Sequence, residues 1–446
     1  MDLTVLIFLL VYVVMGLGKL PGLRVDRTGA AVVGALAMIV VGSISPKGAW
    51  MAIDYRTMGL LFGLMVVSAS FSVSGFYGRA ATRIALLPLQ PAHLVALLVL
   101  VGAGLSAVLT KDVVAVAMVP LLVSLTLARR LNPTPFLLAF CFAVNTGSTA
   151  TLIGSPQNMI TGQTLGISFN DFVVATGVPA VLSLPIVWIM IVLMYRGKWQ
   201  LAEPVQATDP AQAAGPARIA GQAQAAAPAR IAGQAQAAAP AHAPVAPPAF
   251  DRLETYKASV VALAVMAAFI FSPWPHELVA LAAASLLLLS RRMSSHDVLG
   301  RVDGNLLLLI AGLFVVNAAM SATGLPQKAL GGLEHLGLDL NHPLTLYGVG
   351  AVLSNLVGNN PAVMLLVPYL DTKLHVDATA AALVLGTGFS SNLVIFGSLA
   401  GIITVEQSAL FGVRISFGEF FRAGGWITLL TMLMAALWVA FLGSSM

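Results

Sequence analysis

Residues 105–122, LSAVLTKDVVAVAMVPLL, place a full positive charge and a full negative charge side by side within an apolar segment. On insertion scales each such charge costs roughly 2.5 to 3.5 kcal/mol at the centre of a spanning helix. The neighbours Lys111 and Asp112 therefore need a polar environment at membrane depth, and the rest of the chain has to supply it.

A second stretch, residues 353–370, LSNLVGNNPAVMLLVPYL, aligns with the first at an offset of 248 residues. The alignment pairs Pro120 with Pro368 and sets Asn359 and Asn360 opposite the charged pair. A matching pair of polar interruptions in two apolar segments indicates that the chain is built from two related halves.

Further blocks repeat at nearly the same offset. Residues 58–76 align with residues 306–325, and the hexapeptide ISFNDF aligns with ISFGEF. Between the halves, residues 201–250 are mostly Ala, Pro, Gln and Gly, a composition that cannot bury a core. The sequence predicts a first repeat in residues 1–200, a disordered linker in residues 201–250 and a second repeat in residues 251–446.

The composition is that of a polytopic membrane protein. Hydrophobic residues make up 58% of the 446 positions and charged residues only 9%. The opening apolar segment, residues 3–17, has no basic region before it, so it is predicted to be a span in the bilayer rather than a signal peptide. The single cysteine, Cys141, excludes an internal disulfide framework and a thiolate metal cluster, and we predict it to be an apolar filler. No basic patch suggests a nucleic-acid partner.

The fold class predicted from these patterns is an all-α polytopic membrane protein of about ten transmembrane helices plus two re-entrant hairpins. The predicted spans cover residues 3–18, 29–44, 57–76, 136–160 and 172–195 in the first half and 257–273, 276–290, 305–323, 379–405 and 423–443 in the second, with hairpins at 92–126 and 343–370. Five spans per half make the second half enter from the opposite side, so the repeats are inverted. Eighteen of the 23 lysines and arginines then fall on one side, which predicts an inner membrane protein with both termini outside and a cytoplasmic linker.

The hairpin tips are candidate ligand sites, because non-helical backbone at membrane depth is tolerated where it lines a cavity. Asn360 before Pro361 has the pattern of an N-cap, and we expect Asp112 to cap its own half-helix, a role that is compatible with ligand binding. Lys111 has no capping role at a helix N-terminus, so it is either a structural lysine with an ion-pair partner or a ligand contact.

Two apolar spans contain polar breaks, NTGSTATLIGSPQN at residues 145–158 and GTGFSSNLVIFGS at residues 386–398. Such segments either pack tightly against a neighbour or unwind to offer hydroxyl, amide and backbone ligands. These donors suit an oxyanion or a neutral hydroxylated species better than a bare metal ion, so no metal or cofactor is expected. The predicted substrate- and ion-binding residues are Thr110, Lys111, Asp112, Asn145, Thr146, Ser148, Thr149, Ser155, Gln157, Asn158, Asn359, Asn360, Ser390, Ser391, Asn392 and Ser398.

The paired hairpins, together with GSTATLIGSPQNMI and FGSLAGIITVEQS, resemble the ArsB/NhaD permease superfamily, within the ion transporter group that includes citrate and dicarboxylate carriers. The GSPQN block most resembles its anion permease branch. The resemblance implies an elevator-type transporter with a scaffold domain and a mobile transport domain, commonly a homodimer. It also implies that both tips and both broken helices share one substrate site with flanking ion sites.

The sequence departs from the sodium-coupled dicarboxylate members, which carry Ser-Asn-Thr at each tip. Here the tips read Thr110-Lys111-Asp112 and Gly358-Asn359-Asn360. We therefore expect the Lys111 ammonium to take the place of a coupling cation, or to carry a coupling proton with Asp112. The predicted function is a secondary-active permease for a small inorganic or organic anion or oxyanion, linked to protons, with sodium coupling, arsenite efflux and sodium/proton antiport as alternatives. No HExxH, GxSxG or Walker motif occurs, so an enzyme is not expected.

Overall fold

A computed structural model describes residues 3–18, 25–201, 249–328, 332, 337–371 and 375–444. Within these residues the regular structure is helical, apart from one isolated bridge between Leu131 and Gln200. Seven of the described helices are long and apolar enough to cross a membrane, and six shorter apolar helices accompany them. The predicted all-α membrane fold is confirmed. Most of the predicted linker, residues 202–248, lies outside the described residues.

Described helices lie on both sides of the predicted linker. The first half holds α1 (Leu3–Leu17), α2 (Arg27–Val40), α3 (Pro46–Ala52), α4 (Tyr55–Val73), α5 (Phe76–Leu86), α6 (Pro91–Val108), α7 (Lys111–Ala128), α8 (Pro133–Ser148), α9 (Pro156–Leu165) and α10 (Phe169–Met194). The second half holds α12 (Arg252–Phe271), α13 (His276–Leu288), α14 (Ser295–Leu299), α15 (Gly304–Ser321), α17 (Pro343–Val357), α18 (Asn359–Leu366), α19 (Val376–Ser390), α20 (Leu399–Leu410) and α21 (Phe417–Ser444). Helix α5 has no counterpart among the described helices of the second half.

Aspartates start several of these helices. The side chains of Asp26, Asp54, Asp251 and Asp303 accept backbone N–H hydrogen bonds in the first turns of α2, α4, α12 and α15. Each aspartate satisfies donors that have no partner within the helix and favours the positive end of the helix dipole. These caps fix where the polar ends of otherwise apolar helices lie.

Both predicted hairpins are present as helix pairs. The chain turns between α6 and α7 at residues 109–110, and between α17 and α18 at Gly358, whose φ of +94° favours glycine. The predicted caps are both wrong by two residues. Thr110 and Gly358 hold the N-cap positions, so Asp112 and Asn360 lie in the first turns of α7 and α18.

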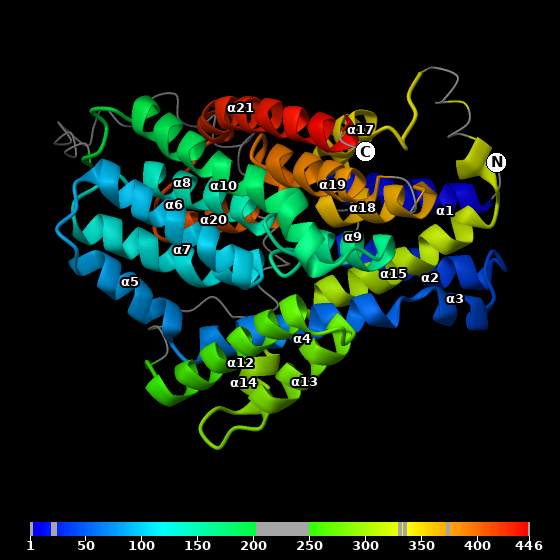
Figure 1. The fold of residues 1–446 in the computed structure, drawn as a ribbon, viewed down its shortest axis with the longest axis horizontal. Coiled ribbons are helices and arrows are strands. Elements are labelled where there is room, and N and C mark those ends of the chain that lie inside the picture. Colours follow the sequence, from blue (N-terminus) through cyan, green and yellow to red (C-terminus); the bar gives the residue numbers. More distant parts are fainter. Residues whose placement is uncertain are drawn as a thin grey trace, which may run out of the picture.

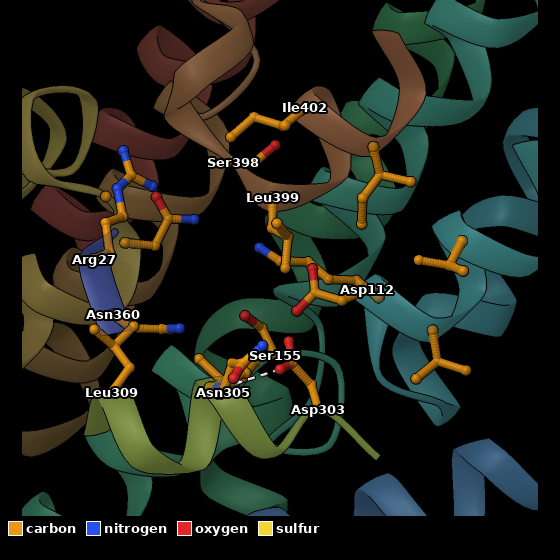
Figure 2. Close-up of a pocket in the computed structure, with 18 of the residues that line it drawn as sticks. Arg27, Asp112, Ser155, Asp303, Asn305, Leu309, Asn360, Ser398, Leu399 and Ile402 are labelled. Atoms are coloured by element: carbon orange, nitrogen blue, oxygen red, sulfur yellow. Dashed lines mark hydrogen bonds between the residues drawn. The ribbon is translucent and has the colours of Figure 1, made fainter. Parts of the chain in front are cut away.

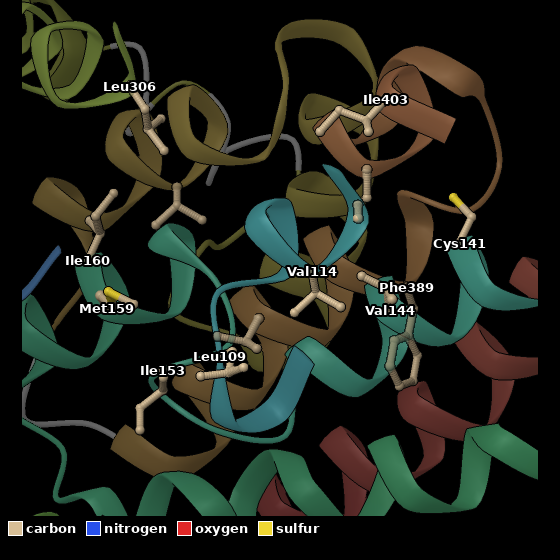
Figure 3. Packing of buried hydrophobic residues seen from close by; sticks show 14 of the residues in the cluster. Leu109, Val114, Cys141, Val144, Ile153, Met159, Ile160, Leu306, Phe389 and Ile403 are labelled. Atoms are coloured by element: carbon tan, nitrogen blue, oxygen red, sulfur yellow. The ribbon is translucent and has the colours of Figure 1, made fainter. Parts of the chain in front are cut away.

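The predicted spans 136–160 and 379–405 are each two helices. The first breaks between α8 and α9 at residues 149–155, and the second between α19 and α20 at residues 391–398. Unwinding, and not packing alone, is therefore the correct interpretation of both polar breaks. Figure 3 shows the apolar packing around the breaks, including Phe389 and Cys141, and the burial of Cys141 agrees with its predicted role as a filler.

The helices form two packing groups (Figure 1). The frame group consists of α1, α2, α4, α12, α13 and α15, in which α4 packs on α13 and α2 packs on α15. The hairpin group consists of α6 to α10 and α17 to α21, in which each hairpin packs on the broken helix of its own half. Figure 1 shows α4, α12 and α13 on the opposite side of the molecule from α10 and α21.

The frame group contains two reciprocal close contacts. A Cβ added at Gly63 of α4 would lie 2.5 Å from the carbonyl carbon of Ala280, and one added at Gly312 of α15 would lie 2.8 Å from that of Ala31. An offset of 249 residues relates Gly63 to Gly312 and also Ala31 to Ala280. Small residues thus let each helix pair approach to backbone contact, and the two pairs use equivalent positions.

We expect Gly63→Ala and Gly312→Ala each to lower the stability of the purified protein by roughly 1 to 3 kcal/mol, because the added methyl group has to displace backbone. The measurement is the midpoint of thermal unfolding in detergent. Gly104→Ala is the matched control, since Gly104 lies within α6 and an added Cβ meets no atom within 4 Å. Equal midpoints for all three variants would contradict the close packing.

Candidate functional site

A cavity of about 770 Å³ lies where the two hairpin tips, the two breaks and the frame group meet. Of the predicted site residues, the cavity is lined by Lys111, Asp112, Ser155, Gln157, Asn359, Asn360 and Ser398. Residues far apart in the sequence are thereby brought to one place, as Figure 2 shows for Asp112, Ser155, Asn360 and Ser398.

Six helices direct their N-terminal ends at this cavity. Its lining includes the first residues of α2, α7, α9, α15, α18 and α20. In three of them, α7, α9 and α18, the N-cap residue makes no side-chain hydrogen bond to the helix. The positive ends of six helix dipoles therefore converge on one volume, and three of these helix ends lack a side-chain cap.

Lys111 is the first residue of α7, and its side chain is 3% exposed. Its backbone N–H donates to the Gly154 carbonyl at 3.0 Å, which joins the first tip to the first break. Its ammonium nitrogen has no hydrogen-bond partner among the described residues. The neighbouring Asp112 likewise has one carboxylate oxygen, Oδ1, without a partner. The buried ammonium of Lys111 and the half-buried carboxylate of Asp112 thus line the cavity, each with an atom that no described residue compensates.

The second tip is fixed by amide and hydroxyl bonds. Asn359 Nδ2 donates to Ser391 Oγ at 2.9 Å, and Ser391 Oγ donates to the Thr387 carbonyl at 2.7 Å. Ser390 and Ser354 share a hydrogen bond of 3.0 Å between their hydroxyl groups. Each tip is therefore tied to the break of its own half, the first through the backbone and the second through side chains.

The remaining predicted site residues hold the breaks together instead of lining the cavity. Asn145 Nδ2 donates to Asn392 Oδ1 at 3.0 Å and to Ser398 Oγ at 2.9 Å, so it links the two halves. Asn158 Nδ2 donates to two carbonyls of the first break at 2.7 Å. Thr146, Ser148 and Thr149 donate to carbonyls within α8, and the Thr110 N–H donates to Ser68 Oγ at 3.0 Å.

Sequence analysis missed the residues that the frame group brings to the cavity. Arg27, Asp303 and Asn305 line it at the starts of α2 and α15, and Glu406 of α20 lines it as well. Asp303 accepts the Leu306 N–H at 3.0 Å, while Arg27 Nε is buried without a partner. These residues could have been found from the Asp-Arg pair at the start of α2 and the aspartate at the start of α15. In the sequence both features lie outside the predicted spans and look like parts of loops.

Asn317 connects the frame group to the second hairpin. Its Nδ2 donates to the Met364 carbonyl at 3.0 Å, and its Oδ1 accepts from the Tyr12 hydroxyl at 2.9 Å. Met364 lies four residues before Pro368, which has no N–H to continue the helical bonding. The position equivalent to Asn317 at an offset of 249 is Ser68, which accepts the N–H of the first tip.

Comparisons with known proteins agree on a transporter. A family model described as Citrate transporter matches residues 10–388. A 46 kDa membrane protein of Mycobacterium leprae is 28% identical over 440 residues, covering 94% of this chain and 95% of that protein. The silicon efflux transporter LSI3 of Oryza sativa is 34% identical over 178 residues, which cover 40% of this chain and 36% of that protein.

Among solved structures, the crystal structure of the YdaH transporter of Alcanivorax borkumensis has a similar fold. Its TM-score is 0.55 at 16% identity, with 99% of this chain and 97% of that chain covered. Similarity over the full length of both chains supports the arrangement of all described helices, and not only that of the hairpins.

We expect Asn317→Ala to lower stability by roughly 1 to 3 kcal/mol, because it leaves the Met364 carbonyl and the Tyr12 hydroxyl buried without their partner. The midpoint of thermal unfolding measures the change. Asn170→Ala is the control, since Asn170 also donates to a carbonyl, that of Ile270, but at an exposed site. An unchanged midpoint for Asn317→Ala would show that these bonds contribute no net stability.

Proposed function

Because the chain belongs to the citrate transporter family, and is therefore a membrane transporter, we propose that it is a secondary-active permease for a small anion or oxyanion. The observation that carries the proposal is the convergence of six helix N-termini with the cationic side chains of Lys111 and Arg27 on one cavity, whose lining also includes the exposed Arg301. Helix N-termini attract anions, and broken helices around a midplane site do so in other transporters.

The location of the two cations strengthens the argument. A positive side chain at a helix N-terminus is unfavourable, yet Lys111 and Arg27 are each the first residue of a helix. Among the described residues, neither forms an ion pair within 4.0 Å, and each has a buried nitrogen without a hydrogen-bond partner. An anionic cargo would compensate both cations and the open N–H groups at once.

Acidic groups at the cavity limit how much negative charge it accepts. Asp303 is engaged as the cap of α15, whereas Asp112 keeps a free oxygen beside Lys111. The adjacent pair Lys111 and Asp112 suits a proton carrier, because a proton moving on or off this pair changes the charge that the cargo meets. We propose that transport is linked to protons through this pair.

The mechanism we propose is an elevator in which the hairpin group moves against the frame group in an inner membrane. The reciprocal contacts of Gly63 with Ala280 and of Gly312 with Ala31 support two inverted repeats in the frame. The distribution of basic residues supports termini outside and a cytoplasmic linker, and the resemblance implies a homodimer.

Efflux of a neutral hydroxylated acid, including arsenous acid, is the second candidate. Asp112 Oδ1 and Gln157 Oε1 are acceptors without partners at the cavity, and they would suit a cargo that brings O–H groups. The rice relative is a silicon efflux transporter, and its match to part of this chain favours the same class.

The test is transport into proteoliposomes with citrate, sulfate and arsenite supplied in turn, under a proton gradient or a sodium gradient imposed separately. Uptake of an anion that follows the proton gradient and ignores sodium supports the proposal. Sodium-driven uptake contradicts the proposed coupling, and cation-dependent proton movement without anion flux indicates an antiporter.

We expect Lys111→Ala to raise the half-saturating concentration of the transported anion about 10-fold to 100-fold, because one charge-assisted hydrogen bond to the anion is lost. We also expect it to abolish the pH dependence of uptake. Lys198→Ala is the control, because Lys198 is exposed beyond the end of α10. Full pH-dependent transport by Lys111→Ala would rule out the lysine as the coupling group.

A further inference from the structure

Arg27 is a contact to the cavity that the frame group supplies. We propose that its guanidinium binds the transported anion on only one side of the membrane, so that the affinity for the cargo differs between the two faces. This inference rests on the proposed function, an anion carried by a moving hairpin group. It assigns to one residue the difference in cargo affinity between the two faces of the membrane.

The position of Arg27 is set by helices that do not belong to the hairpin group. It begins α2, which packs on α15 through the close contact of Ala31 with Gly312. Thr28 Oγ1 also donates to the Asn305 carbonyl at 3.3 Å, so the start of α2 is held against α15. Lys111, by contrast, lies on a hairpin and would travel with the cargo.

Among the described residues the half-buried guanidinium has no ion-pair partner, and its Nε has no hydrogen-bond partner. Asp26, the neighbouring acid, is already used, since it accepts the Gly29 N–H at 2.7 Å and caps α2. Arg27 Nε is buried without a partner, although the side chain lines the cavity. A planar group of five donors is suited to carboxylate or oxyanion ligands.

Arg27 also lies beside the second tip. A Cβ added at Gly358 would be 3.7 Å from Arg27 Nη1, and Figure 2 shows Arg27 next to Asn360 with the open cavity between them and Asp112. Cargo held at the two tips is therefore within the region that the guanidinium faces. In this conformation, the frame group and both hairpin tips line the same cavity.

The equivalent position in the second half carries a different side chain. At an offset of 249 residues Arg27 corresponds to His276, the first residue of α13, just as Asp303 of α15 corresponds to Asp54 of α4. The imidazole of His276 packs on Phe269 with ring centroids 4.5 Å apart. When the tips lie beside α4 and α13 instead, the position of Arg27 carries an imidazole. The arginine near it, Arg56 of α4, corresponds to Asn305 and already faces the Glu277 carboxylate at 4.0 Å, so it has a partner that Arg27 lacks.

The experiment compares the two faces separately. Right-side-out and inside-out membrane vesicles are loaded with unlabelled citrate, and exchange with external labelled citrate gives a half-saturating concentration for each face; labelled sulfate is the second probe. The variant is Arg27→Gln. The matched control is Arg252→Gln, because Arg252 likewise follows a capping aspartate, Asp251, as the first residue of a helix but is exposed.

We expect Arg27→Gln to raise the half-saturating concentration about 10-fold on the face to which the cavity opens, which the predicted topology makes the cytoplasmic face, and less than about twofold on the other. Arg252→Gln should leave both values unchanged. An equal rise on both faces, or no rise on either, would overturn the proposal. If Arg27→Gln does not fold, Arg27→Lys is measured instead. We then expect a smaller rise in the half-saturating concentration, again on the face to which the cavity opens. Wild-type protein that exchanges neither probe would overturn the anion proposal itself, and this inference with it.

Discussion

The structure depends on one constraint, which is that backbone N–H groups exposed at membrane depth have to be compensated without water from the lipid side. Six helices begin at the cavity, and three of them lack a side-chain cap. The two tips, the two breaks and the two frame helices depend on one another in this arrangement. Each brings a polar helix end that would be unstable against lipid, and the others shield that end from lipid. The charges of Lys111 and Asp112 are tolerated because they lie at this cavity and not against lipid.

Much of the fold could be predicted from the repeat alone. The offset that pairs Pro120 with Pro368 also located both hairpins, and the small polar residues around Gly154 and Gly397 located both breaks, because these are local features of the backbone. The caps were less predictable. Asp112 and Asn360 look like N-caps in the sequence, but the turn geometry at Thr110 and Gly358 starts each helix earlier than these side chains suggest.

The candidate site was predictable only in part, because half of it comes from tertiary packing. Lys111 and Asn360 stand out as polar residues in apolar runs, whereas Arg27 and Asp303 look like ordinary loop residues until α2 and α15 pack together. Some predicted site residues lie behind the cavity lining. Asn145 and Asn158 are polar and buried, but their amide nitrogens hold the breaks in shape and lie away from the cavity lining.

The size of the cavity has a consequence for the state of hydration of its contents. A volume of about 770 Å³ is many times the roughly 30 Å³ that one water molecule occupies in the liquid. A small ion therefore occupies only a fraction of the space, and it can enter with much of its solvent shell in place. In the elevator that we propose, the ion would lose this water only when the hairpin group closes on it, so selection by dehydration would take place at that step and not at entry.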